Sequence, residues 1–303
     1  MTPWAGVGDA EEAPGRRLRA LLQQDPVVVA PGVPSPLVGL LARKAGFRAL
    51  YFSGAAFSAT LALPDLGLFT LTELAEAVRH VYRATRLPVI VDADTGFGEV
   101  LNVARAVEEL EHAGAAAIQI EDQEMPKKCG HLGGKVVGDA EEMAAKVAAA
   151  ARVRRDVLVV ARTDARATHG FEEAVRRARL YREAGADVIF PEALESEEEF
   201  REFARRVEAP LLANMTEFGK TPYFSVDQFR QWGYRIVIFP VTVLRAAARA
   251  AEEVLQVLRD RGTQVPVLDR LQTREELYSL IGYHLYERFD REIAMKAGTK
   301  GAS

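Results

Sequence analysis

The amino-acid sequence predicts an α/β protein that folds as a single (β/α)8 barrel of the TIM type. Eight short apolar runs recur along the chain, and a stretch with the spacing of an amphipathic helix follows each of them. Strict alternation of this kind favours a closed barrel over an open sheet. The segment after the first run, residues 30–34, reads Ala-Pro-Gly-Val-Pro, which lacks the Gly-x-Gly-x-x-Gly of a dinucleotide-binding fold. We therefore predict one domain over residues 1–303.

The eight predicted strands are apolar and rich in β-branched residues, as buried parallel strands are. In chain order they cover residues 27–29, 49–52, 89–91, 117–120, 157–160, 187–190, 211–213 and 236–239. Capping-box patterns, which satisfy the first free amides of a helix, mark four helix starts: Thr70/Glu73, Ser196/Glu199, Ser225/Gln228 and Thr273/Glu276. Helix ends are predicted at glycines that can adopt a left-handed conformation: Gly46, Gly114 and Gly185.

Two helical segments lie outside the eight units. The N-terminal segment, residues 1–25, contains a predicted helix from about Glu11 to Leu22 that would cover the floor of the barrel. The C-terminal extension, residues 263–303, carries an apolar stripe at helical spacing: Leu277, Ile281, Leu285 and Phe289. Such a stripe packs either against its own barrel or against another subunit, and the pattern leaves both alternatives open.

The composition disfavours several classes of protein. A formal net charge of -4 and a pI near 5.9 argue against a general nucleic-acid binder, which needs a basic excess. The single cysteine, Cys129, allows no intrachain disulfide. No apolar run reaches the roughly 20 residues of a membrane helix, and the first residues do not resemble a signal peptide. We expect a cytoplasmic protein with neither a nucleic-acid nor a membrane partner.

Three carboxylates follow the third and fourth predicted strands. Asp92 and Asp94 stand two residues apart, so an extended chain would point both to one side, and Glu121 ends the neighbouring strand. In a barrel of this type the C-terminal strand ends form the active-site face. Converging carboxylates repel one another unless a cation lies among them, and all-oxygen ligation suits Mg²⁺ or Mn²⁺. The pattern therefore predicts a magnesium site.

Further polar groups follow the other strands and start the C-terminal extension. Arginine is suited to hold a carboxylate at two points, and neutral groups can complete such a pocket. The candidates are Arg162, Arg245, Arg274, Glu192, Asn214 and Thr216. Together they predict a pocket for a small, multiply charged carboxylate bound to metal. Tyr51, in the second strand, is a candidate general base, provided that the metal and the arginines lower its pKa from about 10.

A long polar loop with several glycines, residues 123–135, follows the fourth strand and is expected to act as a mobile lid. Lys127, Lys128 and His131 flank Cys129 and are expected to lower the pKa of its thiol. That would make Cys129 a proton donor or nucleophile near neutral pH. Zinc ligation is disfavoured because Cys-x-His supplies only two ligands, and a phosphate loop because Gly-Gly-Lys lacks the P-loop spacing.

These motifs resemble those of the isocitrate lyase and phosphoenolpyruvate mutase superfamily over nearly the whole chain. The matching segments are 53–55 (Ser-Gly-Ala), 63–65 (Leu-Pro-Asp), 91–98 (Val-Asp-Ala-Asp-Thr-Gly-Phe-Gly), 120–123 (Ile-Glu-Asp-Gln), 127–131 (Lys-Lys-Cys-Gly-His), 161–164 (Ala-Arg-Thr-Asp), 190–192 (Phe-Pro-Glu) and 214–217 (Asn-Met-Thr-Glu). The cysteine string is specific to the lyases. Within the lyases, the short chain, Phe190 before Pro191, and the Asn-Met-Thr string are similar to the 2-methylisocitrate lyase branch.

The resemblance implies a Mg²⁺-dependent carbon-carbon lyase that cleaves 2-methylisocitrate into pyruvate and succinate by a retro-Claisen step, in the methylcitrate cycle of propionate catabolism. It also implies a homotetramer whose C-terminal helices are exchanged between neighbours. By the same resemblance, Cys129 would protonate the succinate half, Arg162 would hold the pyruvyl half, and Asp92 would lead the metal ligands. Glu121 and Tyr51 would complete the catalytic group. Substrate contacts would come from Ser53, Gly54, Ala55, Gly130, His131, Arg162, Glu192, Asn214, Met215, Thr216, Arg245 and Arg274.

Three other functions stay open at this point. Isocitrate lyases share the cysteine loop and would release glyoxylate in place of pyruvate. A decarboxylase or hydrolase of 2-oxo acids is disfavoured by that loop. A non-catalytic carboxylate-binding barrel would keep the arginines but has no need of Cys129 on a lid.

Overall fold

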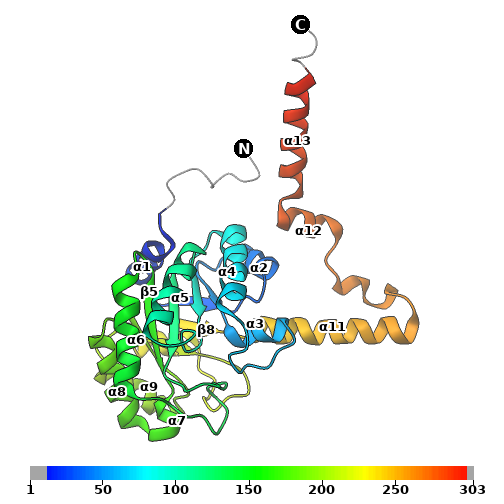
Figure 1. The fold of residues 1–303 in the computed structure, drawn as a ribbon. Helices are drawn as coiled ribbons and strands as arrows, with labels where there is room; N and C mark the ends of the chain where they lie inside the picture. The colour runs from blue at the N-terminus through cyan, green and yellow to red at the C-terminus, as the bar shows by residue number, and fades with distance from the viewer. Residues whose placement is uncertain (1–11, 299–303) are drawn as a thin grey trace. The chain divides into compact units, whose positions relative to one another are not determined.

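The computed structural model describes residues 12–298 and shows an α/β fold with parallel strands (Figure 1). The chain forms two compact units, of which one comprises Ala13–Ala246 and the other contains the chain from Ala247 onward. The first unit holds the strands and most of the candidate site residues. The predicted N-terminal helix is α1 (Pro14–Gln24), while Glu11, its predicted start, lies outside the described residues.

The strands lie where the sequence predicts them. They are β1 (Val28–Pro31), β2 (Leu50–Phe52), β3 (Val89–Asp92), β4 (Ala117–Glu121), β5 (Leu158–Thr163), β6 (Val188–Pro191), β7 (Leu212–Asn214) and β8 (Ile236–Phe239). Several extend past the apolar run into the polar residues that follow it. As a result Asp92 lies opposite Gln119, and Glu121 lies opposite Arg162, within the hydrogen-bonded ladders. The ladders thus hold the backbone of these polar residues in place.

The strands form two parallel sheets, one in the order β2-β3-β4-β5-β6 and the other in the order β1-β8-β7. A parallel bridge between Gly32, just after β1, and Tyr51 of β2 connects them at one edge. A second parallel bridge, between Ile189 of β6 and Leu211 just before β7, connects them at the other edge. Both edges of each sheet are therefore linked to the other sheet.

The helices of this unit lie around the outside of the strands (Figure 1). They are α1, α2 (Pro36–Lys44), α3 (Gly54–Thr60), α4 (Leu71–Thr85), α5 (Val100–His112), α6 (Ala140–Val153), α7 (Ala165–His169), α8 (Phe171–Glu183), α9 (Glu197–Arg206) and α10 (Val226–Gln231), followed by the start of α11 (Thr242–Arg261). The short helices α3 and α7 were not predicted. Both begin immediately after a strand, and α3 begins at Gly54, next to the candidate site.

The apolar core has two layers because alternate residues of each strand point to opposite faces. One layer packs the strands against the helices and includes Val91, Ile118 and Val159. The other layer contains the alternate residues of all eight strands: Val28, Tyr51, Ile90, Ala117, Val160, Phe190, Leu212 and Ile238. Leu18 of α1 is completely buried in this second layer. The amphipathic helix α1 therefore covers one end of it, as the sequence predicts.

The predicted helix boundaries are confirmed by their hydrogen bonds. Thr70, Ser225 and Thr273 each form the full capping box, while Ser196 accepts from the amide of Glu199 without the reciprocal bond. Left-handed glycines follow helices α2, α5 and α8 as predicted: Gly46 (φ 92°), Gly114 (φ 99°) and Gly185 (φ 112°). Capping of this kind satisfies amides and carbonyls that a helix leaves free.

The second unit contains the rest of α11, a 3-10 helix (Val265–Arg270), α12 (Arg274–Ile281) and α13 (Tyr283–Gly298). The apolar stripe predicted from Leu277 to Phe289 is interrupted at Gly282, whose φ of 72° ends α12. Tyr278 and Tyr283 stack across the break with ring centroids 4.5 Å apart. Among the described residues, no helix combines the length and apolarity needed to cross a membrane.

Candidate functional site

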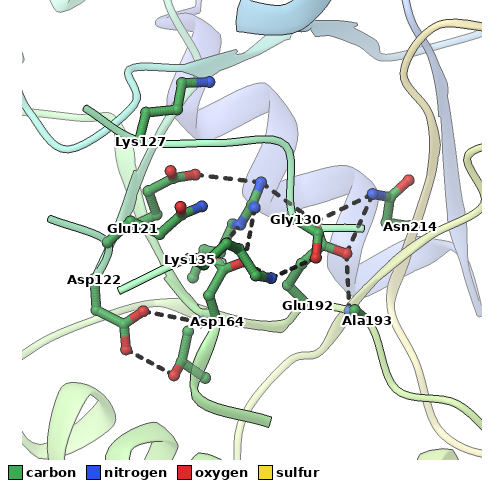
Figure 2. A network of polar contacts seen from close by, with 12 residues as sticks. Glu121, Asp122, Lys127, Gly130, Lys135, Asp164, Glu192, Ala193 and Asn214 are labelled. Carbon is green, nitrogen blue, oxygen red and sulfur yellow. Dashed lines mark hydrogen bonds and ion pairs between the residues drawn. The ribbon is translucent and has the colours of Figure 1, made fainter. Parts of the chain in front are cut away.

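The polar side chains at the ends of β3, β4, β5 and β6 are buried together. Asp92, Glu121, Arg162 and Glu192 each expose less than a tenth of their surface. Buried charges are stable only when paired or bound to an ion, so these groups must satisfy one another or a ligand. Figure 2 shows Glu121, Asp164 and Glu192 in one network with Lys135 and Asn214. The ends of these four strands therefore gather the buried charged residues of the predicted site.

Asp92 is held by three hydrogen bonds. Its Oδ2 accepts from the amide of Gly54 at 3.1 Å, and its Oδ1 accepts from Gln119 Nε2 at 3.1 Å and from the Asp94 amide at 3.3 Å. Gln119 in turn accepts from the hydroxyl of Tyr51 at 2.9 Å. The buried chain Tyr51–Gln119–Asp92 thus fixes the orientation of the Asp92 carboxylate. Sequence reasoning missed Gln119, although its place two residues before Glu121 on β4 puts it on the same face.

The protein groups around Tyr51 do not by themselves lower its pKa, although the expectation also invoked a bound metal ion. Burial raises the pKa of the phenol well above 10, and the neighbouring Asp92 carboxylate raises it further, against a smaller lowering by Arg162. The hydroxyl is a hydrogen-bond donor to Gln119. Tyr51 is therefore placed to orient Asp92, and its environment opposes the role of general base that we predicted for it.

Asp94 converges with Asp92, but not by strand alternation. The strand β3 ends at Asp92, and Asp94 lies in a turn with a left-handed φ of 49°. A methyl group added at Gly54 would lie 3.0 Å from Asp94 Oδ1 and 3.2 Å from Asp92 Oδ2, so both carboxylates face this glycine. Burial raises the pKa of Asp94 to about 7, in spite of Lys127, whose Nζ lies 2.7 Å from Asp94 Oδ1.

Lys127 also forms an ion pair with Asp65. Asp65 belongs to the segment 63–65 that the resemblance singles out, yet sequence reasoning assigned it no role. Its partner reaches it from a loop 62 positions further along the chain. No local signal in the sequence indicates such a pair.

Glu121 is the least satisfied of the three carboxylates. It is 2% exposed, and neither of its oxygens accepts a hydrogen bond. Its one close cation is Arg162, with Nη1 3.3 Å from Oε2. Burial raises the pKa of Glu121 well above its usual range, and Arg162 and Lys127 offset this only in part. A buried carboxylate without hydrogen bonds would be stabilised by a further cation.

The residues present fit a magnesium ion. Within residues 12–298, no three His, Cys, Asp or Glu side chains are gathered as a metal-binding group, so the predicted trio is not assembled around one point. The structure does bring the oxygens of Asp92 and Asp94 to the same side of Gly54. Mg²⁺ in proteins is commonly held by one or two carboxylates, with water and substrate completing its octahedron. Two facing carboxylates, with Glu121 nearby on the next strand, meet this requirement.

Arg162 is the central cation of the site. Its Nε and Nη2 bind both oxygens of Asp164, at 2.8 and 3.1 Å, and its Nη1 lies 3.3 Å from Glu121 and 3.2 Å from Glu192. The guanidinium also lies over the ring of Phe190, 5.3 Å from its centroid. Planar, bidentate pairing of this kind fixes the direction of the arginine fork.

Glu192 is a buried carboxylate that lies against two basic side chains. Although burial opposes its charge, Arg162 and then His131 hold the pKa of Glu192 well below its usual range. Its oxygens lie 3.2 Å from Arg162 Nη1 and from His131 Nε2. Asn214 donates to the same carboxylate at 3.3 and 3.4 Å. Glu192 therefore aligns three of the predicted substrate-binding side chains.

The loop after β4 lies directly over these strand ends. A methyl group added at Gly130 would lie only 2.6 Å from Arg162 Nη2 and 2.4 Å from Glu192 Cγ, so the loop backbone touches the site. Lys135 donates to the Gly130 carbonyl and, at 2.6 Å, to Asp164. Gln123 brackets Lys128 with bonds of 3.0 and 2.8 Å to its amide and carbonyl. Cys129 directly precedes Gly130, and the charges of Glu192 and Arg162 act on the pKa of its thiol.

The expected lowering of the Cys129 pKa is wrong. Burial raises the pKa of the thiol above its ordinary value near 9, against a smaller lowering by the backbone hydrogen bond at His131. The basic neighbours are occupied elsewhere: Lys127 pairs with Asp65 and Asp94, and Lys128 donates to the carbonyl of Gly134. The lysines next to Cys129 in the sequence therefore place their charges on other groups and not on the thiol. Cys129 is therefore a protonated thiol at neutral pH.

The remaining predicted residues make their contacts outside the buried cluster of Asp92, Glu121, Arg162 and Glu192. Ser53 caps α3 by accepting from the amide of Ala56, and Ala55 lies in the first turn of that helix. Met215 packs in the outer apolar layer, where its sulfur accepts from Phe224, so its side chain serves packing. Thr216 follows β7. Arg245 is about half exposed and donates to the carbonyl of Glu217 at 3.1 Å. Arg274 begins α12, in the second unit.

Asp122 and Asp164 were also missed, although Asp122 directly follows Glu121 and Asp164 comes two residues after Arg162. Asp122 is fully buried and accepts from Thr163 Oγ1 at 2.7 Å, from the Asp164 amide at 2.8 Å and from Tyr181 at 2.9 Å. Arg177 of α8 lies 3.2 Å from it. This network holds Asp164, which in turn holds Arg162. The signal available was the acidic residue after each strand end, but only the tertiary structure shows that it faces inward.

Comparison with known proteins places the chain in a known family. Residues 18–259 match the family model described as phosphoenolpyruvate phosphomutase, and the chain belongs to this family. It is 64% identical over 286 residues to the 2-methylisocitrate lyase of Aeropyrum pernix, covering 94% of this chain and 93% of that protein. The predicted resemblance is confirmed.

Two solved structures are similar in fold. A crystal structure of 2,3-dimethylmalate lyase, described as a member of the phosphoenolpyruvate mutase/isocitrate lyase superfamily, has a TM-score of 0.85 and 37% identity, covering 97% of each chain. A phosphonopyruvate hydrolase, in complex with oxalate and Mg²⁺, has a TM-score of 0.82 and 32% identity, covering 94% of this chain and 99% of the other. Members of different specificity thus share this fold.

Proposed function

We propose that this protein is a carbon-carbon lyase that cleaves 2-methylisocitrate into pyruvate and succinate. The observation that carries the proposal is the packing of the cysteine loop: Gly130, the residue after Cys129, lies against Glu192 and against Arg162, a buried arginine suited to hold a carboxylate. The 64% identity to a protein named 2-methylisocitrate lyase supports the choice of substrate.

We further propose that the two sheets form one closed eight-stranded barrel. Two observations support closure: a bridge links the sheets at each edge, and residues of all eight strands share one buried apolar layer. In such a barrel the loops after the strands share a single face, where the active site lies. Asp92, Glu121, Arg162 and Glu192 would then line one cavity mouth.

Asp92 and Asp94 are the residues that we propose to hold Mg²⁺, or Mn²⁺, with Glu121 acting directly or through water. When bound, this ion would bind and polarise the hydroxyl and adjacent carboxylate of the substrate. The chain of hydrogen bonds from Tyr51 through Gln119 keeps the Asp92 carboxylate turned toward the site. Gly54 leaves the space between Asp92 and Asp94 open, because any side chain there would meet both.

The residues of the chain supply binding and the final proton. Arg162 would hold the pyruvyl half, while Gly130, Asn214, Thr216 and Arg245 would bind the carboxylates of the succinyl half, with Ser53 and the Gly54–Ala55 backbone contributing from α3. Glu192 would orient Arg162 and Asn214 through its contacts with them. The role expected of Arg274, which begins α12 in the second unit, stays a prediction. The C2 hydroxyl gives its proton to a base and becomes the carbonyl of pyruvate as the C2–C3 bond breaks. The electron pair of that bond moves to C3 of the succinyl half, where the Cys129 thiol donates its proton, and the thiolate is reprotonated from solvent. The raised pKa of Cys129 supports an acid over a nucleophile, since the thiol holds its proton at neutral pH.

The exchange of C-terminal helices within a homotetramer remains a proposal. Large apolar side chains of α12 and α13 are exposed in the single chain, among them Ile281 and Ile293. Surfaces of this kind are commonly covered by a partner. Sedimentation velocity is expected to give a mass four times that of the chain, and a monomer at micromolar concentration would contradict the proposal.

The proposed activity is tested by coupling pyruvate release to lactate dehydrogenase. With 2-methylisocitrate and Mg²⁺ we expect steady pyruvate formation that EDTA abolishes and excess Mg²⁺ restores. Isocitrate, with glyoxylate trapped as its phenylhydrazone, is the matched comparison, because the two substrates differ by one methyl group, which is worth about 1 to 3 kcal/mol of discrimination. Preferential release of glyoxylate would favour an isocitrate lyase, and no product from either substrate would contradict the lyase proposal.

A further inference from the structure

The cysteine loop is fastened to a second loop through His131. The amide of Lys220 donates to His131 Nδ1 at 3.0 Å, across 89 positions of sequence. On the other side of the ring, His131 Nε2 lies 3.2 Å from Glu192 Oε1. The ring therefore lies between the Lys220 amide and the Glu192 carboxylate. The side chain is 6% exposed, so the ring is enclosed.

Gly219 leaves the space that the imidazole fills. A methyl group added at Gly219 would lie 2.5 Å from His131 Nδ1 and 2.8 Å from Cγ. These distances are far shorter than van der Waals contact, so the ring would have to leave its place. The φ of Gly219 is outside the left-handed region that favours glycine. Space for the ring, and not backbone conformation, is therefore what this glycine supplies.

The loop that carries Gly219 is itself anchored to the strands. Thr221, which is buried, donates to the carbonyl of Leu194 at 2.7 Å, and the Phe218 amide donates to the hydroxyl of Tyr223 at 2.9 Å. Upstream, the Met215 amide donates to the carbonyl of Ile238 in β8. The Phe218 bond stays within the loop, while the Met215 and Thr221 bonds tie the loop to neighbouring segments before and after Gly219. It is thus a fixed surface against which the cysteine loop can rest.

We propose that Gly219, the Lys220 amide and Glu192 form a socket for His131, and that this socket positions the cysteine loop so that Cys129 reaches the substrate. Gly219 is a positioning residue, since it acts through His131 and touches no reacting atom. Lys127 and Lys135 hold the loop before and after this point through their ion pairs with Asp94 and Asp164. The socket holds the middle of the cysteine loop at His131, two residues from Cys129. The link to turnover rests on the proposed lyase function, whereas the link to loop position does not.

Cys129 is the only cysteine of the chain, so its alkylation reports on the loop alone. The test compares Gly219→Ala with Gly133→Ala, the same change within the loop, where an added methyl group meets no atom within 4 Å. Alkylation by iodoacetamide at fixed pH is followed by mass spectrometry on the intact protein. We expect labelling of Gly219→Ala to be about tenfold faster than wild type or more, and that of Gly133→Ala to stay within about twofold. Circular dichroism and the unfolding midpoint establish that each variant is folded.

Equal labelling rates in Gly219→Ala and wild type would overturn the socket, as would equal acceleration in both variants. His131→Phe provides a second test that adds no atom at Gly219, because it keeps a ring but can neither accept from Lys220 nor pair with Glu192. It too is expected to be labelled about tenfold faster. If Gly219→Ala does not fold, His131→Phe decides alone, and a wild-type labelling rate in it would contradict the proposal.

Steady-state kinetics separate this inference from the proposed function. In Gly219→Ala, kcat for pyruvate release is expected to fall about tenfold or more with KM changed by less than about threefold, because the substrate-binding groups are retained while proton delivery is impaired. If Gly219→Ala is labelled faster than wild type but the wild type has no lyase activity, the proposed function is wrong and the socket is supported. If the wild type is an active lyase and Gly219→Ala has the same kinetics and labelling rate, the proposed function is supported and the socket is wrong.

Discussion

Cys129→Ser is expected to lower kcat for 2-methylisocitrate by about 100- to 10,000-fold, the range that general acid catalysis contributes. A serine hydroxyl has nearly the same size but is a far weaker acid than a thiol, so it would occupy the same place over Arg162 without delivering a proton. Binding of pyruvate and succinate, measured by calorimetry in the presence of Mg²⁺, should be almost unchanged. A variant that retains most of its turnover would show that the proton comes from another group.

The same pair of proteins checks the ionisation of the thiol. The difference in absorbance at 240 nm between wild type and Cys129→Ser reports the thiolate, because every other group is shared. Since burial raises the thiol pKa, the thiolate signal should be absent at pH 7 and should appear only as the pH rises above 9. A signal complete by pH 8 would instead support the lowered pKa that the flanking lysines first suggested.

Arg162→Met is expected to lower the free energy of unfolding by about 3–5 kcal/mol, the usual cost of removing one partner from a buried ion pair. The side chain is 7% exposed, and its removal leaves Glu121, Asp164 and Glu192 without their shared cation. Activity should be lost as well, because the arginine is the proposed ligand of the pyruvyl carboxylate. Urea unfolding at pH 7, compared at equal m-values, measures the change in stability.

The matched control for this variant is Arg205→Met, which removes an arginine from the exposed pair with Glu202 on α9. Exposed pairs contribute little because water and salt screen them. Its unfolding midpoint and its kcat should equal those of wild type. If Arg162→Met also unfolded at the wild-type midpoint, the three carboxylates would have to be satisfied without the arginine, and its central place in the site would be wrong.

Much of the fold was predictable because its signals are local. Every predicted strand is present, and the helix starts at Thr70, Ser225 and Thr273 follow from side chains that bond to amides three residues away. The exception at Gly282 has the same local origin. A glycine in the left-handed conformation ends α12 inside an apolar stripe whose period alone predicts one continuous helix.

The site was predictable in its composition but not in its electrostatics. Asp92, Glu121, Arg162 and Glu192 could be named because parallel strands bring their C-terminal ends to one edge. Their partners could not, since Lys127 reaches Asp65 across 62 positions and Lys135 reaches Asp164 across 29. The pKa of a group depends on burial and on charges brought from distant segments. That is why the expected lowering of the Cys129 pKa was wrong, and why the protein groups around Tyr51 raise the pKa of its phenol.

By itself, then, the sequence determined the order and kind of the elements, the polar character of the strand ends and the family to which the chain belongs, because hydrophobic period, capping and motif are written in neighbouring residues. Only the tertiary structure decided how those groups act on one another. It placed Gln119 behind Asp92, Asp164 behind Arg162 and Gly219 behind His131. The first and third of these contacts join segments that only folding brings together. The second, between residues two positions apart, fixes an orientation that depends on the packing around Asp164.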